Sequence, residues 1–213
     1  MEVARIPVRR DTNRVKKDLK ALCDEAIQYG ASDARILNAR EIAASRLAQQ
    51  RKGTMVSAEE ESIHWPEPLY PKDSLEEAMS CYRWAIVFRV DPDKEDQEEK
   101  KPLLRDSVLW KAHEKVFRIA SMIESSCFYR GYHLAIGLAA TNCRDVFCFG
   151  ERRCWAMIKG KPCIYPFKAR PALEACGLDP QVLAKRAGWD TSSVSTSKGL
   201  SNQEFLAGLV LVT

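Results

Sequence analysis

The chain has 213 residues, a hydrophobic content of 46% and a formal net charge of +4. A chain of this length can bury a sizeable core, so we expect one domain over residues 1–213. The small net charge gives no reason to expect a nucleic-acid partner, and no apolar run approaches the roughly 20 residues of a membrane-spanning helix.

The N-terminal residues and the cysteine content bear on the cellular compartment. The first residues are charged and lack the apolar stretch of a signal peptide, which favours a cytoplasmic protein. The chain carries eight cysteines. In a reducing compartment such residues are more often metal ligands or core thiols than disulfides.

The first regular elements are an expected helix and an expected strand. Apolar side chains recur at helical spacing over residues 12–29. Asp11 or Thr12 can cap this helix, and Gly30 lies where it would end. Residues 33–44 are expected to form a strand or a strand pair.

The segment that follows is expected to be irregular. Residues 50–72 include IHWPEPLYP, whose three prolines exclude a helix or a central strand. A short helix is expected over residues 73–80. A second metal site would need several thiolate or imidazole ligands, and residues 45–66 offer only His64, so we expect this stretch to bind no metal. Trp65 either forms an aromatic lid near the cysteine-rich segment described below or fills a gap in the core.

Three apolar segments are expected to be strands of one sheet. Residues 82–90, 132–140 and 205–213 are each too apolar to be left exposed, which is typical of strands buried on both faces. A long amphipathic helix is expected over residues 106–129, between the first two of these strands.

Shorter helices are expected near the C-terminus. Pro171 can open one that Gly177 ends, and Asp179 followed by Pro180 is a clear start for another that reaches about Ala187. Strands interleaved with helices predict an α/β or α+β fold. In this fold helices pack on a mixed sheet, and a cysteine-rich metal-binding loop follows a central strand.

Four cysteines lie close together in the sequence, immediately after the second expected strand. Cys143, Cys148, Cys154 and Cys163 follow the spacing C-x4-C-x5-C-x8-C. Four thiols on a short, turn-rich segment can meet at one point at little cost in loop closure. We therefore expect the four sulfurs to converge as metal ligands, within a cysteine-rich segment that covers residues 143–176.

The spacing of these cysteines bears on the identity of the metal. A structural zinc site usually shows two separated pairs of cysteines, each pair roughly two to four residues apart. Here the spacings widen steadily and no close pair occurs, which suits an iron–sulfur cluster, of the 4Fe-4S type, better than zinc. Zinc is the alternative metal, and free or disulfide-linked cysteines are the alternative without metal.

Basic side chains outnumber acidic ones around the four cysteines. Cations lower the pKa of nearby thiols, stabilise a cluster with net negative charge, and can steer an acidic redox partner. An ordinary solvated loop would show the same charges. The basic residues are Arg144, Arg152, Arg153, Lys159, Lys161, Lys168 and Arg170.

Other residues near the segment are weaker candidates. His133, at the start of the strand that leads to the cysteines, and Cys176, which follows Cys163, are possible additional ligands. Each has an ordinary alternative: a surface or core histidine, and a small side chain that packs a short helix. Trp155 and Tyr165 either shield the centre from water or pack as ordinary aromatics. The cysteines expected in the core are Cys23, Cys81 and Cys127.

Several of these pieces together resemble a known family. ESSCFYRGYHLAIGLAA, the four cysteines, GKPCIYPFKARPALEACGLDP and the terminal strand look like the bacterial and archaeal family of predicted metal-binding proteins, domain of unknown function 2284. The resemblance covers residues 117–180 well and residues 20–213 loosely, and it implies metal binding without a reaction. Besides the four cysteines, the matching positions are Glu124, Gly131, Tyr132, Ala169, Arg170, Pro171, Glu174 and Ala175.

The chain departs from the family pattern at two places. The family usually spaces its first three cysteines more tightly, and its members often carry N-terminal cysteines that end in Cys-Pro-Pro. Here the corresponding stretch reads SIHWPEP. The resemblance therefore implies no N-terminal metal or redox role for this chain.

The residues lead to one preferred function and two alternatives. The preferred one is a metal-binding, iron–sulfur protein that exchanges electrons with an unknown redox partner. The alternatives are a zinc-stabilised binding module and a redox enzyme that holds a cluster beside a substrate pocket. No phosphate-binding loop, nucleophile–base order or paired carboxylates stand out, so the sequence assigns no catalytic residue and no reaction.

Overall fold

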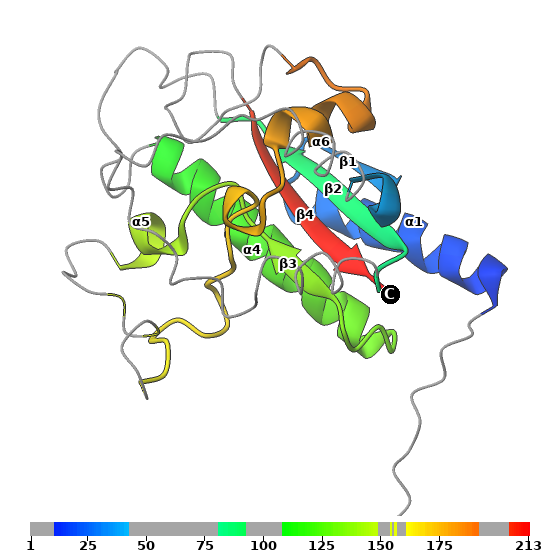
Figure 1. Ribbon diagram of the computed structural model, residues 1–213, viewed down its shortest axis with the longest axis horizontal. Helices are drawn as coiled ribbons and strands as arrows, with labels where there is room; N and C mark the ends of the chain where they lie inside the picture. Colours follow the sequence, from blue (N-terminus) through cyan, green and yellow to red (C-terminus); the bar gives the residue numbers. More distant parts are fainter. Residues whose placement is uncertain are drawn as a thin grey trace, which may run out of the picture.

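The structure is a computed structural model that describes residues 11–42, 81–92, 108–148, 154, 156, 161–191 and 205–213. In this part of the chain, helices pack on both faces of one four-stranded sheet (Figure 1). The helices are α1 (Thr12–Gln28), α4 (Val108–Tyr129), α5 (Cys143–Phe147), the 3-10 helix η3 (Glu174–Cys176) and α6 (Pro180–Ala187). The strands are β1 (Asp33–Asn38), β2 (Trp84–Val90), β3 (Ile136–Leu138) and β4 (Leu206–Val212).

The sheet has the strand order β1-β2-β4-β3, and every neighbouring pair is antiparallel, whereas the sequence predicts a mixed sheet. The three apolar segments expected in one sheet contribute β2, β3 and β4, so that prediction is confirmed, and the α+β fold is confirmed with it. β1 lies beside β2 at the far edge, within the segment expected to be a strand or strand pair. The C-terminal strand β4 therefore lies in the interior of the sheet, between β2 and β3.

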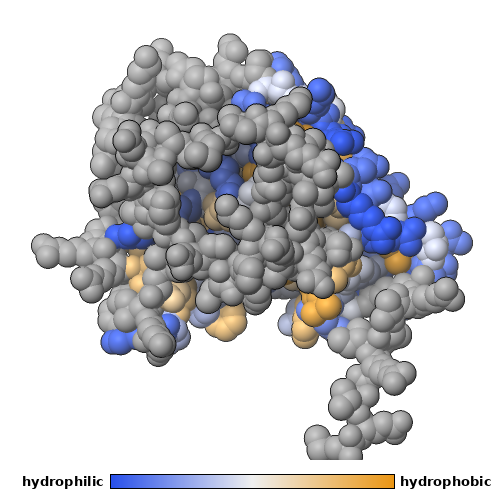
Figure 2. Space-filling model, in the orientation of Figure 1, coloured by the Kyte–Doolittle hydropathy of each residue, from blue (hydrophilic) through white to orange (hydrophobic). Residues whose placement is uncertain are grey.

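Both faces of the sheet are covered, which explains why its inner strands are apolar at nearly every position. All residues of β4 are buried. Helices α1 and α4 pack on one face, where Leu19 and Phe117 belong to the same core as β2 and β4. On the other face, the core includes Leu173 and Leu183, which lie near η3 and in α6. Figure 2 shows hydrophilic side chains over α1, as its amphipathic pattern predicts.

Local signals in the sequence set the ends of α1 and α6. Asp11 caps α1 by accepting a hydrogen bond from the backbone N–H of Asn13 at 3.0 Å. Asp179 caps α6 in the same way, at 2.8 Å from the N–H of Gln181. Gly188 ends α6 in the left-handed region, with a φ of 76°. Both helices therefore begin where the sequence predicts.

The structure differs from the expectations around β3. The sequence predicts a long central strand, whereas β3 covers only Ile136–Leu138 and lies at the edge of the sheet. The reason is that β4 takes the interior position, and Ala139 bonds instead with the backbone of residues 171–173. The helix expected to start at Pro171 is also shorter, because only η3 forms there.

The expectations for residues 45–80 concern a part of the chain outside the described residues. None of the described helices combines the length and the apolar character needed to cross a membrane.

Gly208 in β4 pairs with Phe88 in β2, and a side chain at position 208 would not fit. A Cβ atom there would lie 2.3 Å from Cζ of Phe88. We therefore expect Gly208→Ala to lower the free energy of unfolding by about 1–3 kcal/mol, the usual cost of overpacking a core. Urea unfolding followed by circular dichroism measures this loss. The added substitution Phe88→Leu should restore part of it, and a Gly208→Ala variant with the wild-type midpoint would contradict this packing.

Candidate metal centre

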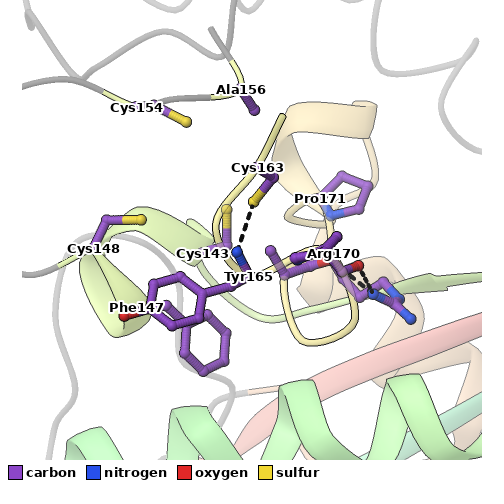
Figure 3. A pocket seen from close by; sticks show the side chains of 11 residues that line it. Cys143, Phe147, Cys148, Cys154, Ala156, Cys163, Tyr165, Arg170 and Pro171 are labelled. Atoms are coloured by element: carbon purple, nitrogen blue, oxygen red, sulfur yellow. Dashed lines mark hydrogen bonds between the residues drawn. The ribbon is translucent and has the colours of Figure 1, made fainter. Parts of the chain in front are cut away.

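The four cysteines predicted as ligands line one cavity of about 290 Å³ (Figure 3). In Figure 3 their thiols surround a common space and approach it from different sides. The structure therefore brings together Cys143, Cys148, Cys154 and Cys163, and their role as metal ligands stays a prediction. The other lining residues are Phe147, Ala156, Tyr165, Pro166, Ala169, Arg170 and Pro171.

Helix α5 positions two of the four cysteines, Cys143 as its first residue and Cys148 at its C-cap. The side chain of Asn142 caps the helix by accepting a hydrogen bond from the N–H of Arg144 at 3.1 Å. At the other end, the N–H of Cys148 donates to the carbonyl of Arg144 at 3.0 Å. The sequence predicts only a loop after β3, and the structure replaces the first part of that loop with this short helix.

Helix α5 is itself anchored on the long helix α4. The indole N–H of Trp110 donates to the carbonyl of Val146 at 3.0 Å. The ring of Phe147 packs edge-on against Phe117, with 5.0 Å between the centroids, and lies 5.7 Å from the ring of Tyr165. These contacts fix the direction in which α5 presents its cysteines and form an aromatic wall on one side of the sulfurs (Figure 3).

The segment after Cys163 forms another wall of the cavity. The backbone N–H of Tyr165 donates to the Cys163 sulfur at 3.3 Å. The chain then turns, because the N–H groups of Lys168 and Ala169 both donate to the carbonyl of Tyr165, at 3.1 and 2.9 Å. The turn keeps Tyr165 and Ala169 beside the thiol of Cys163 in the cavity lining.

The cysteine-rich segment leaves the sheet and returns to it at one place. Shortly before Cys143, the N–H of Ala139 donates to the carbonyl of Pro171 at 2.9 Å. The carbonyl of Ala139 accepts from the N–H of Leu173, also at 2.9 Å. Because both ends are held at the same edge of the sheet, the residues between them close into a loop whose cysteines face one cavity.

The carboxylate of Glu124 in α4 also binds to this edge of the sheet. The Oε2 atom of Glu124 accepts from the backbone N–H of Gly137 at 2.6 Å and from Nε of Arg170 at 2.9 Å. Arg170 also donates to the carbonyl of Ala169 at 2.8 Å, and its guanidinium points away from the sulfurs (Figure 3). The charge of Arg170, which the sequence places in the basic surround, therefore pairs with Glu124 rather than with the thiols.

Burial and the neighbouring thiols keep Cys143 protonated when no metal is bound. Burial, and after it the nearby Cys154, Cys148 and Cys163, together raise the pKa of this thiol from 9.0 to about 12. In the ranges that the structure describes, no three Cys, His, Asp or Glu side chains are grouped in a way that would hold a metal ion. The four thiols nevertheless line one shared cavity.

His133 and Cys176, the possible additional ligands, do not line the cavity. His133 is exposed, and its ring packs against Phe128 with 4.8 Å between the centroids. Cys176 is half-buried and packs against the core on the α6 face of the sheet. Both residues therefore show the ordinary packing that the sequence allows as their alternative.

The three cysteines expected in the core differ in burial. Cys127 is buried, which confirms its prediction, and Cys23 is half-buried against the same core. Cys81 is exposed, so its prediction is wrong; it precedes β2 instead of forming part of it. The candidate residues outside the described part of the chain are His64, Trp65, Arg152, Arg153, Trp155 and Lys159.

Sequence reasoning missed Phe147 and the contacts of Glu124. Phe147 immediately precedes Cys148, and an aromatic residue next to a ligand is the signal that could have found it. Glu124 has no comparable local signal. Its partners Gly137 and Arg170 lie 13 and 46 residues further along the chain, and only the fold brings them together.

The raised pKa of Cys143 can be tested on protein stripped of metal. At pH 8 we expect iodoacetamide to modify the exposed Cys81 well before Cys143, because the thiolate is the reactive form and Cys143 is almost wholly a thiol. Peptide mass spectrometry gives both rates. The rate at Cys143 should rise steadily from pH 8 to pH 10, whereas equal rates at pH 8 would contradict its burial.

Comparison with known proteins adds the family. A family model described as predicted metal-binding protein (DUF2284) matches residues 66–212, which is more than half of the chain. No curated protein and no solved structure matches. The matched range includes all the residues that line the cavity, together with Glu124. The chain therefore belongs to the family of predicted metal-binding proteins called domain of unknown function 2284.

Proposed function

We propose that this protein binds an iron–sulfur cluster, of the 4Fe-4S type, through Cys143, Cys148, Cys154 and Cys163, and that it transfers electrons. The shared cavity is the observation that carries the proposal, since the four cysteines line one space of about 290 Å³. Cysteine thiolates are the usual ligands of iron–sulfur clusters. The described lining contains no histidine and no carboxylate that would point to a harder metal ion.

The size of the cavity supports a cluster over a single ion. Its volume of about 290 Å³ far exceeds the roughly 30 Å³ of one water molecule. Four thiolates around one zinc ion would each lie about 2.3 Å from it, so their sulfurs would be nearly in contact. A core of several iron and sulfide atoms suits sulfurs that surround a wider space.

Residues beside the thiols would influence the properties of a cluster. The N–H of Tyr165 stabilises negative charge on the Cys163 sulfur, and hydrogen bonds to sulfur are one of the factors that set cluster potentials. The rings of Phe147 and Tyr165 lie together in the lining and would exclude water from one side of the cluster.

The lining also supports electron transfer over catalysis at this cavity. Arg170 is the one charged side chain in its described lining, and it is paired with Glu124. General acid–base catalysis most often uses a histidine or a carboxylate, and neither is present among these residues. Exposed Lys161 and Lys168, on either side of Cys163, suit a redox partner with an acidic surface.

Anaerobic purification followed by metal analysis tests the proposal. We expect brown protein with broad visible absorbance and about four iron and four sulfide per chain. Colourless protein with about one zinc per chain would contradict the cluster and support the zinc-stabilised binding module instead. Protein purified anaerobically and free of any metal would contradict metal binding at this cavity.

Single substitutions of cysteine by serine test the ligand set. Cys143→Ser, Cys148→Ser, Cys154→Ser and Cys163→Ser should each strongly reduce the iron content, because each removes a thiolate from the cavity. Cys176→Ser is the matched control and should retain the wild-type iron content, since Cys176 does not line the cavity. An equal loss of iron in the control would bring Cys176 into the ligand set.

A further inference from the structure

We infer that Glu124 is a positioning residue for the metal centre: through Gly137 and Arg170 it holds one wall of the cysteine cavity in place before a metal binds. Glu124 itself does not line the cavity. The inference rests on the metal binding proposed above, and it assigns a role to a residue that would touch neither the metal nor its ligands.

The carboxylate of Glu124 joins two parts of the chain to helix α4. Its Oε2 atom accepts one hydrogen bond from the backbone of β3, at Gly137, and one from the side chain of Arg170, at 2.6 and 2.9 Å. Hydrogen bonds to a charged acceptor are stronger than those between neutral groups. The pair is also shielded from solvent, since the side chains of Arg170 and Glu124 are 13% and 28% exposed.

Position 137 allows the carboxylate to reach the strand because it is a glycine. A Cβ atom there would lie 2.9 Å from Oε2 of Glu124 and 3.1 Å from the carbonyl oxygen of Ala120. The N–H of Gly137 bonds to Glu124, and the N–H of Ala139 bonds to Pro171. The two N–H groups that point outward from this edge of the sheet therefore both donate to groups that support the cavity wall.

Arg170 carries the effect of Glu124 to the cavity. It lines the cavity together with its neighbours Ala169 and Pro171, and it donates to the carbonyl of Ala169 at 2.8 Å. The wall that it stiffens continues directly into the turn that follows Cys163. Removing the carboxylate would therefore loosen this wall and leave all four thiols chemically unchanged.

Metal affinity is the first measurement. Glu124→Ala should weaken metal binding by about tenfold, the lower end of the effect of residues that orient metal ligands. Glu124→Gln keeps an oxygen acceptor without the charge and should recover part of the affinity. Competition with a chelator, on anaerobically prepared protein, measures both. Wild-type affinity in Glu124→Ala would overturn the inference.

The ion pair between Glu25 and Arg130 provides a matched control. It joins α1 to the chain just after α4, its side chains are 21% and 28% exposed, and neither lines the cavity. Glu25→Ala should therefore lower the melting temperature about as much as Glu124→Ala and keep the wild-type metal affinity. An equal loss of metal affinity in both variants would show a general loss of stability and overturn the inference.

Hydrogen exchange on metal-free protein separates this inference from the proposed function. In Glu124→Ala, the amides of Ala139 and Leu173 should exchange about tenfold faster, because the edge opens locally once the charged acceptor is lost. The amide of Val210, whose backbone faces Ile86 of β2 rather than β3, should keep its wild-type rate. Unchanged exchange at Ala139 and Leu173 would overturn the positioning role. If the wild-type protein binds no metal, the proposed function fails and this measurement still decides the role of Glu124.

Discussion

The cavity depends on how one edge of the sheet is closed. Strand β3 is an edge strand that pairs only with β4. Without further contacts, the backbone N–H groups on its outer side would have no hydrogen-bond partners. The carboxylate of Glu124 accepts a hydrogen bond from the N–H of Gly137, and the carbonyl of Pro171 accepts one from the N–H of Ala139. The groups that satisfy the edge belong to the two supports of the cavity, helix α4 and the end of the cysteine-rich segment. The same hydrogen bonds therefore satisfy the edge of the sheet and hold the ends of the cysteine-rich segment together.

Helix α4 is the scaffold from which the cavity is assembled. Trp110 and Phe117 hold helix α5, and Glu124 holds β3 and Arg170. The three residues recur at an interval of about two helical turns, so they lie in one stripe along α4. The adjacent face of the helix packs into the core with α1, β2 and β4, and Phe117 belongs to that core as well. A rigid helix therefore presents a single stripe of contacts to the whole cysteine-rich segment.

The chemistry of the cavity follows from four thiols held in apolar surroundings. The pKa of about 12 at Cys143 shows how strongly burial opposes a bare thiolate there. Arg170 does not lower this pKa, because its charge pairs with Glu124. In the proposed site the metal would supply positive charge beside the sulfurs, and metal binding has to displace protons from the thiols. Metal loading would accordingly be favoured as the pH rises.

The sequence alone is enough to predict the elements that depend on neighbouring residues. Asp11, Asp179 and Gly188 mark helix ends through caps and backbone conformation, and the apolar run of β2 marks a strand buried on both faces. The grouping of Cys143 to Cys163 likewise rests on spacing along the chain. These features are local, so periodicity and residue type are enough to find them.

Contacts between distant segments could be found only in the folded structure. The interior place of β4, the shortness of β3 and the exposure of Cys81 depend on strand pairing between parts of the chain that are far apart. The contacts of Glu124 with Gly137 and Arg170 depend on it as well. A single carboxylate on an amphipathic helix has no periodic or spacing signal of its own. Its partners are set by how the helix packs on the sheet, and that packing is decided by the whole core at once.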